Sequence, residues 1–95
     1  MKQAMSTTLA LPPVLDITAA GPLASEFLRA RGKDVSIDAS KVERVGAQCI
    51  QVLLSAVATW TLDGMEFDLA NPSAALVEGL DIAGLEPANF IARNA

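Results

Sequence analysis

Residues 65–69 alternate strictly between apolar and acidic side chains, in the order Met, Glu, Phe, Asp, Leu. Successive side chains of a β-strand point to opposite faces of the sheet, so this alternation predicts a strand with one buried face. Residues 34–38 alternate in a similar way, with Val35 and Ile37 on the apolar face. Together the two segments predict a sheet that helices cover on one side only.

Helical patterns lie between the extended segments. Three runs have apolar residues at helical spacing and, at their ends, residues that start or stop helices. The expected helices are residues 18–32, 46–62 and 71–84, and a short final turn or helix follows Pro87. Thr18 is expected to cap the first helix, and Asn71 with Pro72 to begin the third.

Residues 7–11 and 14–17 are expected to be short extended pieces at the edge of a sheet, because Pro12 and Pro13 cannot donate ladder hydrogen bonds. The alternation of strands and helices predicts an α/β fold with parallel neighbouring strands. We expect a small mixed β-sheet of about four strands, covered mainly on one face by three to four helices. A chain of 95 residues has room for one domain, which we expect to span residues 1–95 with a core over about 7–92.

The composition argues against catalysis. The chain contains no His and no Tyr, so only carboxylates and Lys remain as plausible proton-transfer groups, and we expect neither enzyme activity nor a cofactor. Cys49 is the single cysteine and has no His with which to form a metal site. We expect it to be a small packed residue rather than a redox sensor.

The distribution of charge limits the kinds of partner. The net charge is -4 and the seven Lys and Arg residues are scattered, so we do not expect binding to nucleic acid. Near the N-terminus, Pro12 and Pro13 interrupt an apolar stretch far short of a signal peptide or membrane span. We therefore expect a cytoplasmic protein without direct membrane insertion.

Three pieces of the sequence resemble the STAS family, which is named for sulphate transporters and anti-sigma-factor antagonists. They are Val35-Ser36-Ile37-Asp38 with Val42, then Ile50-Gln51-Val52-Leu53-Leu54-Ser55-Ala56, and finally Asn71-Pro72-Ser73-Ala74-Ala75-Leu76 followed by Asp81-Ile82-Ala83-Gly84-Leu85. The last piece is the most specific, because a strand, a cap, a proline, a helix and a Gly-Leu corner recur together in the family. The resemblance implies a STAS-like fold and a domain that acts by binding a protein partner.

In this family, an Asp-Ser-Ser-Gly sequence at the start of the long helix carries the regulatory switch, because a partner kinase phosphorylates its second serine. Matching the helices places Gly46, Ala47, Gln48 and Cys49 on these four positions. Gln48 is therefore equivalent to the phosphosite, and it cannot accept a phosphoryl group. The resemblance implies a domain that has lost regulation at this site or that is controlled through its partner.

Residues 46–62 contain no charged side chain, although a helix on one face of a sheet normally exposes a polar stripe. We expect the buried side to hold Ile50, Leu53, Leu54 and Val57. The opposite side offers small neutral groups that can be dehydrated at low cost, as the core of an interface requires. With the start of the helix included, the expected partner-binding residues are Arg44, Gly46, Ala47, Gln48, Gln51, Val52 and Ser55.

Trp60 lies at the margin of this surface. It is expected either to pack against the first helix or the sheet, or to be exposed as an anchor for a partner, since indole rings are enriched among binding hot spots. The low-charge helix is also compatible with a homodimer.

The partner that the resemblance implies is a histidine-kinase-like ATPase, bound by an anti-sigma-factor antagonist or by an accessory protein of a chemotaxis kinase. The alternative is the STAS subunit of a bacterial lipid-transport ATPase complex, in which the domain binds the transporter's nucleotide-binding subunit without phosphorylation. The sequence leaves these readings open.

Overall fold

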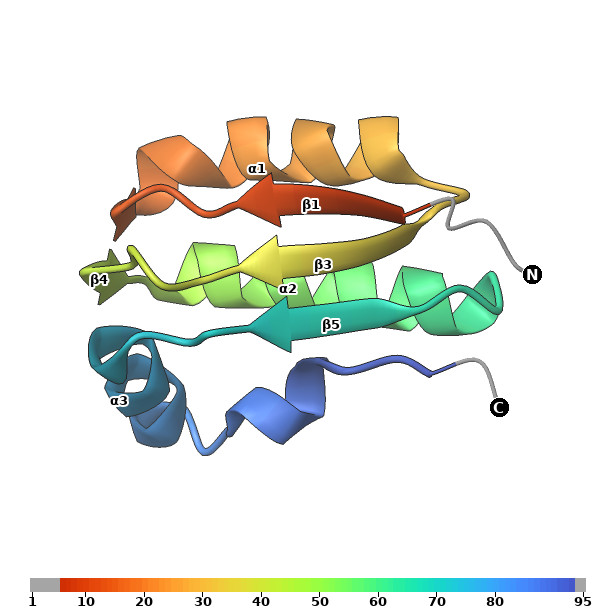
Figure 1. The fold of residues 1–95 in the computed structure, drawn as a ribbon. Helices are drawn as coiled ribbons and strands as arrows, with labels where there is room; N and C mark the ends of the chain where they lie inside the picture. The colour runs from red at the N-terminus through yellow and green to blue at the C-terminus, as the bar shows by residue number, and fades with distance from the viewer. Residues whose placement is uncertain (1–5, 94–95) are drawn as a thin grey trace.

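Figure 1 presents a computed structural model of the chain, which describes residues 6–93. Its elements, in order, are β1 (Ser6–Ala10), β2 (Val14–Leu15), α1 (Ile17–Ala30), β3 (Asp34–Asp38), β4 (Arg44–Val45), α2 (Ala47–Leu62), β5 (Phe67–Ala70), α3 (Ala74–Ile82) and the 3-10 helix η1 (Pro87–Phe90). Strands and helices alternate along the chain, so the predicted α/β class is confirmed.

The strands form two parallel sheets, one of three strands and one of two. In the larger sheet, β3 lies between β1 and β5. The smaller sheet joins β2 to β4, and Ala92 adds an antiparallel bridge to Phe67. The sequence predicts about four strands in one sheet, but Pro12 and Pro13 separate β1 from β2, and the two pieces pair with different strands.

Helices cover one face of the three-stranded sheet, and α2 lies behind it in Figure 1. Val35, Ile37 and Leu69 face the helices and are buried, with exposed fractions of 3%, 0% and 6%. Asp38 and Asp68, at alternate positions, are only half-buried. The alternation in the sequence therefore predicts the covered face of the sheet correctly.

Two helices begin at residues other than those predicted. Asp16, rather than Thr18, caps α1, and its carboxylate accepts hydrogen bonds from the N–H and the hydroxyl of Thr18 at 3.0 and 2.6 Å. Ser73, rather than Asn71, caps α3, since its hydroxyl accepts a hydrogen bond from the N–H of Leu76 at 3.1 Å. Asn71 instead has a left-handed backbone with a φ of 52°. In both helices the cap is the residue whose oxygen reaches a free amide of the first turn.

The buried side of α2 differs from the prediction. The buried residues are Cys49, Ile50, Leu53, Ala56 and Trp60. Leu54 and Val57, which were expected on the buried side, are only half-buried. The reason is that α1 packs beside α2 and helps to cover the flank that carries Ala56 and Trp60.

Trp60 is a core residue, with 2% of its surface exposed. Its ring packs against Phe27 of α1 and Phe67 of β5, with centroid distances of 6.0 and 5.8 Å. The indole N–H donates a hydrogen bond to the carbonyl oxygen of Lys33 at 2.7 Å, so burial leaves no unpaired donor. Of the two alternatives for Trp60, packing against the first helix and the sheet is therefore the correct one.

We expect Gly79→Ala to destabilise the protein, although alanine normally favours a helix over glycine. Gly79 lies inside α3, where an added Cβ would overlap Cγ1 of Val45 on β4. Because the β-branched Val45 is stiff, this crowding should cost about 1–3 kcal/mol.

Gly21→Ala in α1 is the matched control for this substitution. Nothing lies within 4 Å of a Cβ added at Gly21, but Pro22 follows it and disfavours helical backbone in a preceding residue that has a Cβ. The gain in helix propensity is therefore offset, and the free energy of unfolding should change by less than about 1 kcal/mol. Urea unfolding measures both effects. Equal free energies of unfolding for Gly79→Ala and Gly21→Ala would contradict the close packing of α3 against β4.

Candidate functional site

The start of α2 carries Gly46, Ala47 and Gln48, which the family resemblance places on the switch positions. Gly46 is the N-cap, and its N–H donates a hydrogen bond to the carbonyl oxygen of Leu15 at 2.8 Å, which ties the helix start to β2. No side chain caps this helix. Ala47 and Gln48 are exposed in its first turn. The neutral amide of Gln48 therefore lies at the positive end of the helix dipole, where a phosphoryl group would be favoured.

Beside the helix start, an open groove of about 360 Å³ lies between α1 and α2. Gln51, Val52 and Ser55, three of the predicted partner-binding residues, line it. Gln51 and Ser55 are exposed, and Val52 is half-buried. The structure therefore brings these three residues together in one concave surface.

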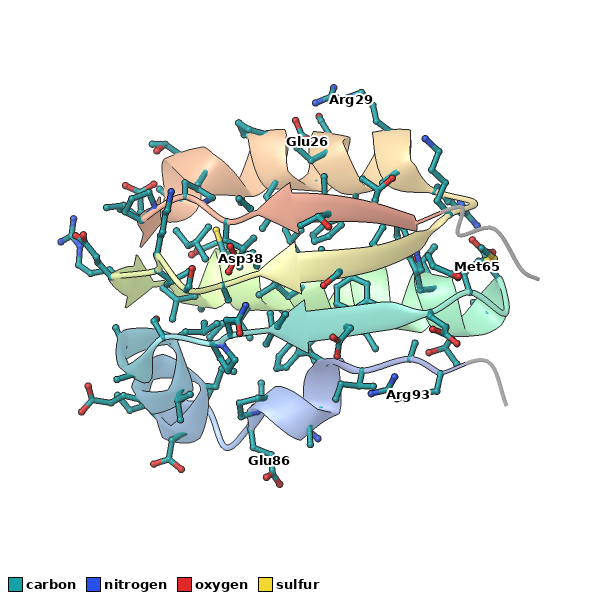
Figure 2. The ribbon with its side chains drawn as sticks, in the orientation of Figure 1. Glu26, Arg29, Asp38, Met65, Glu86 and Arg93 are labelled. Carbon is teal, nitrogen blue, oxygen red and sulfur yellow. The ribbon has the colours of Figure 1, made fainter. Side chains whose placement is uncertain are left out.

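The second wall of the groove comes from α1 and includes Phe27, Leu28 and Arg31. The sequence did not assign any of them to the site, because a groove between two helices depends on how the helices pack. Leu28 carries a signal that could have been used, since it is apolar and yet 70% exposed. On the outer face of α1, Glu26 and Arg29 form an ion pair at 2.6 Å and point away from the sheet in Figure 2.

Among residues 6–93, Arg31 is the one charged residue that lines the groove. Its Nε and Nη2 donate hydrogen bonds to Oδ2 and Oδ1 of Asp63 at 2.9 and 3.2 Å, which joins the C-terminal ends of α1 and α2. The hydrogen bond and the positive charge from Arg31 lower the pKa of Asp63 below its ordinary value. Because the ion pair balances the charge of Arg31, the groove is close to neutral.

The other predicted partner-binding residues lie outside the groove. Gly46, Ala47 and Gln48 form the start of α2, and Arg44 is exposed in β4. The predicted set is thus divided among β4, the start of α2 and one wall of the groove, and α1 adds the second wall.

Cys49 faces the core and is 0% exposed. Its thiol donates a hydrogen bond to the carbonyl oxygen of Asp16 at 3.3 Å. Burial, and then the negative charge of Asp16, raise the pKa of the thiol. A protonated, buried thiol is a poor nucleophile, so Cys49 is a packed residue, as the sequence predicts.

Two further properties bear on the kinds of site that the described part of the chain can form. Among residues 6–93, no group of three or more acidic or cysteine side chains is arranged to hold a metal ion. Within the same residues, no helix combines the length and the apolar character that are needed to span a membrane.

We expect Cys49 to resist alkylation by iodoacetamide in the folded protein at neutral pH, because its thiol is buried and protonated. After unfolding in urea it should react at the rate of an ordinary thiol. Mass spectrometry of samples taken over time measures both rates. Rapid alkylation without denaturant would contradict the packed position of Cys49.

We expect Asp63→Asn to reduce the acid sensitivity of the fold. Since the pKa of Asp63 is lowered in the folded state, its ion pair stabilises the protein above the ordinary carboxyl pKa of about 4. This contribution is lost as the pH falls from that value through the lower pKa of the folded state. The variant should therefore be less stable than the wild type at neutral pH and similar to it in acid. Urea unfolding at several pH values tests this, and a stability difference that does not change with pH would contradict it.

The comparisons with known proteins agree with this architecture. A family model described as "Mlab, STAS domain" matches residues 2–91, which is nearly the whole chain. No curated protein and no solved structure matches the chain. STAS domains generally mediate protein–protein interactions and are generally non-catalytic. The chain therefore belongs to the STAS-domain family, and its general character is that of a regulatory module like the anti-sigma-factor antagonists.

Proposed function

We propose that the protein is a non-catalytic, cytoplasmic regulatory module that binds a histidine-kinase-like ATPase through the groove between α1 and α2. It acts as an anti-sigma-factor antagonist or as an accessory protein of a chemotaxis kinase. The observation that carries the proposal is the lining of this groove. Gln51, Val52 and Ser55 belong to it and also to the partner-binding set predicted from the family resemblance.

The chemistry of the groove suits contact with a protein. Leu28 is 70% exposed on one wall, so a partner that covers it removes apolar surface from water. Complete burial of such a side chain contributes roughly 1.5–3 kcal/mol. In the part of the chain that the structure describes, the only charge in the lining belongs to Arg31, and Asp63 balances it, so little electrostatic desolvation opposes binding.

The groove is also formed before a partner arrives. Phe27 and Trp60 line it, and both rings are fixed in the aromatic cluster with Phe67. A surface that is already ordered loses little conformational entropy on binding. This favours a stable docking surface over a loop that folds on contact.

Gln48 bears on how the interaction is regulated. A phosphoryl group at the start of the long helix would add a charge of about -1.5 to -2 beside the docking surface. Gln48 is exposed at this position and stays neutral, so the surface keeps one charge state. Regulation then rests with the state or the abundance of the partner.

Gln48 also favours a second candidate function, the STAS subunit of a bacterial lipid-transport ATPase complex. In such a complex the domain binds the nucleotide-binding subunit of the transporter without being phosphorylated. This candidate and the first differ in the identity of the ATPase and not in the nature of the surface.

Capture of partners from a lysate of the source cells distinguishes the two candidates. Tagged protein should retain a kinase-like ATPase if the first is right and a transporter ATPase if the second is right, and mass spectrometry identifies which. The purified ATPase domain then provides the ligand for calorimetric titration of the wild-type protein and its variants.

We expect Ser55→Asp to weaken this binding at least about tenfold, because it places a charge without a partner in the neutral groove. Ser25→Asp is the matched control, since Ser25 is an exposed serine of α1 that does not line the groove. It should bind as the wild type does. Equal affinities of Ser55→Asp and Ser25→Asp would reject the groove as the docking surface.

A further inference from the structure

The net charge of the protein is concentrated in its C-terminal third. Residues 1–63 contain six basic and six acidic residues, whereas residues 64–95 contain one basic and five acidic residues. The whole net charge of -4 therefore belongs to the part of the chain that includes β5, α3 and η1. Charge of one sign gathered on one side of a small domain attracts partners of the opposite sign.

Within this region, an open groove of about 560 Å³ lies between α3 and the start of η1. Its apolar part consists of Val77, Leu85 and Pro87 together with Ala74. Its acidic part consists of Glu78, Asp81 and Glu86, and no basic residue of the described range 6–93 lines it. In Figure 2 the side chain of Glu86 points away from the sheet into solvent. The groove thus combines apolar surface with accessible carboxylates.

No carboxylate of this groove forms an ion pair within the described part of the chain, although the side chain of Glu86 accepts a hydrogen bond from the backbone N–H of Asn89. The ion pairs found among residues 6–93 use Glu26 and Asp63, and none involves an acidic residue of this groove. Val77 is 39% exposed, and Ile82 at the end of the same helix is 84% exposed. Exposed apolar side chains beside carboxylates without a cationic partner are typical of a surface that binds a partner.

This groove is separate from the one between α1 and α2. In Figure 1, α3 and η1 lie beyond β5, whereas α1 lies along the opposite edge of the sheet. The two grooves share no lining residue. A ligand of the α3–η1 groove would therefore leave the other groove accessible, and the inference does not depend on the proposed function.

We propose that the α3–η1 groove docks a basic amphipathic segment of a partner protein. Apolar side chains of the segment cover Val77 and Leu85, while its Lys and Arg side chains meet the three carboxylates. The same charges repel nucleic acids and anionic lipid surfaces. A second copy of this chain fits poorly, because it brings an equally acidic surface and its basic residues are scattered.

Titration of the isotope-labelled full chain with a synthetic peptide, followed by NMR, tests the proposal. The peptide has Leu and Lys at amphipathic helical spacing, and a second peptide has Glu in place of Lys. We expect the Lys peptide to shift the amide signals of the α3–η1 groove and not those of the α1–α2 groove, with an affinity that falls as salt is added. Equal binding of the Glu peptide, or shifts spread over every acidic part of the protein, would overturn the proposal.

Glu78→Gln combined with Asp81→Asn should weaken binding of the Lys peptide roughly fivefold, as expected for the loss of two exposed charge contacts. The matched control, Glu26→Gln combined with Glu43→Gln, removes the same number of charges outside the groove and should bind as the wild type does. An equal loss of affinity in both double variants would mean that peptide binding depends only on the net charge of the protein. That result would contradict the assignment of the peptide to the α3–η1 groove.

Ser55→Asp separates this site from the proposed function. The substitution alters the α1–α2 groove alone, so it should leave the affinity for the Lys peptide unchanged while it weakens binding of the ATPase. A loss of peptide binding in Ser55→Asp would place the peptide in the α1–α2 groove and overturn the assignment to α3 and η1.

Discussion

The contact between Phe27, Trp60 and Phe67 holds the layers of this protein together. The three rings come from α1, α2 and β5, and their centroids lie 5.7 to 6.0 Å apart. The hydrogen bond from Trp60 to the carbonyl oxygen of Lys33 also fixes α2 to the turn that precedes β3. Because Phe27 and Trp60 line the α1–α2 groove as well, the contact that closes the core also sets the distance between the two walls of the groove.

The two grooves differ in the property by which each would select a partner. The α1–α2 groove is neutral, so shape and buried apolar area would determine which partner fits it. The α3–η1 groove lies in the part of the chain that carries the net charge, and there the charge of the partner affects both the rate of encounter and specificity. A domain with both surfaces can bring two proteins together without any catalytic group, which agrees with the regulatory character of the STAS family.

The start of α2 is held in place by its backbone and not by a capping side chain. The helix begins without a side-chain cap, and the hydrogen bond from Gly46 to Leu15 fixes its position through the backbone. The side chain at Gln48 is therefore free to change without altering the path of the chain. A neutral amide there leaves the helix dipole without the negative group that would be most favourable, while the surface beside it stays intact.

The sequence by itself determined the α/β class, the covered face of the sheet and the neutrality of residues 46–62, because each depends on periodicity or composition within a single element. In residues 34–38 and 65–69, apolar side chains occupy every second position, so only one face of each strand can be the buried one. Tertiary structure decided which side of α2 is buried, where Trp60 lies and that α1 forms the second wall of the groove. A helix without charged residues has no polar stripe to fix its rotation, so only its packing against α1 and the sheet could decide it.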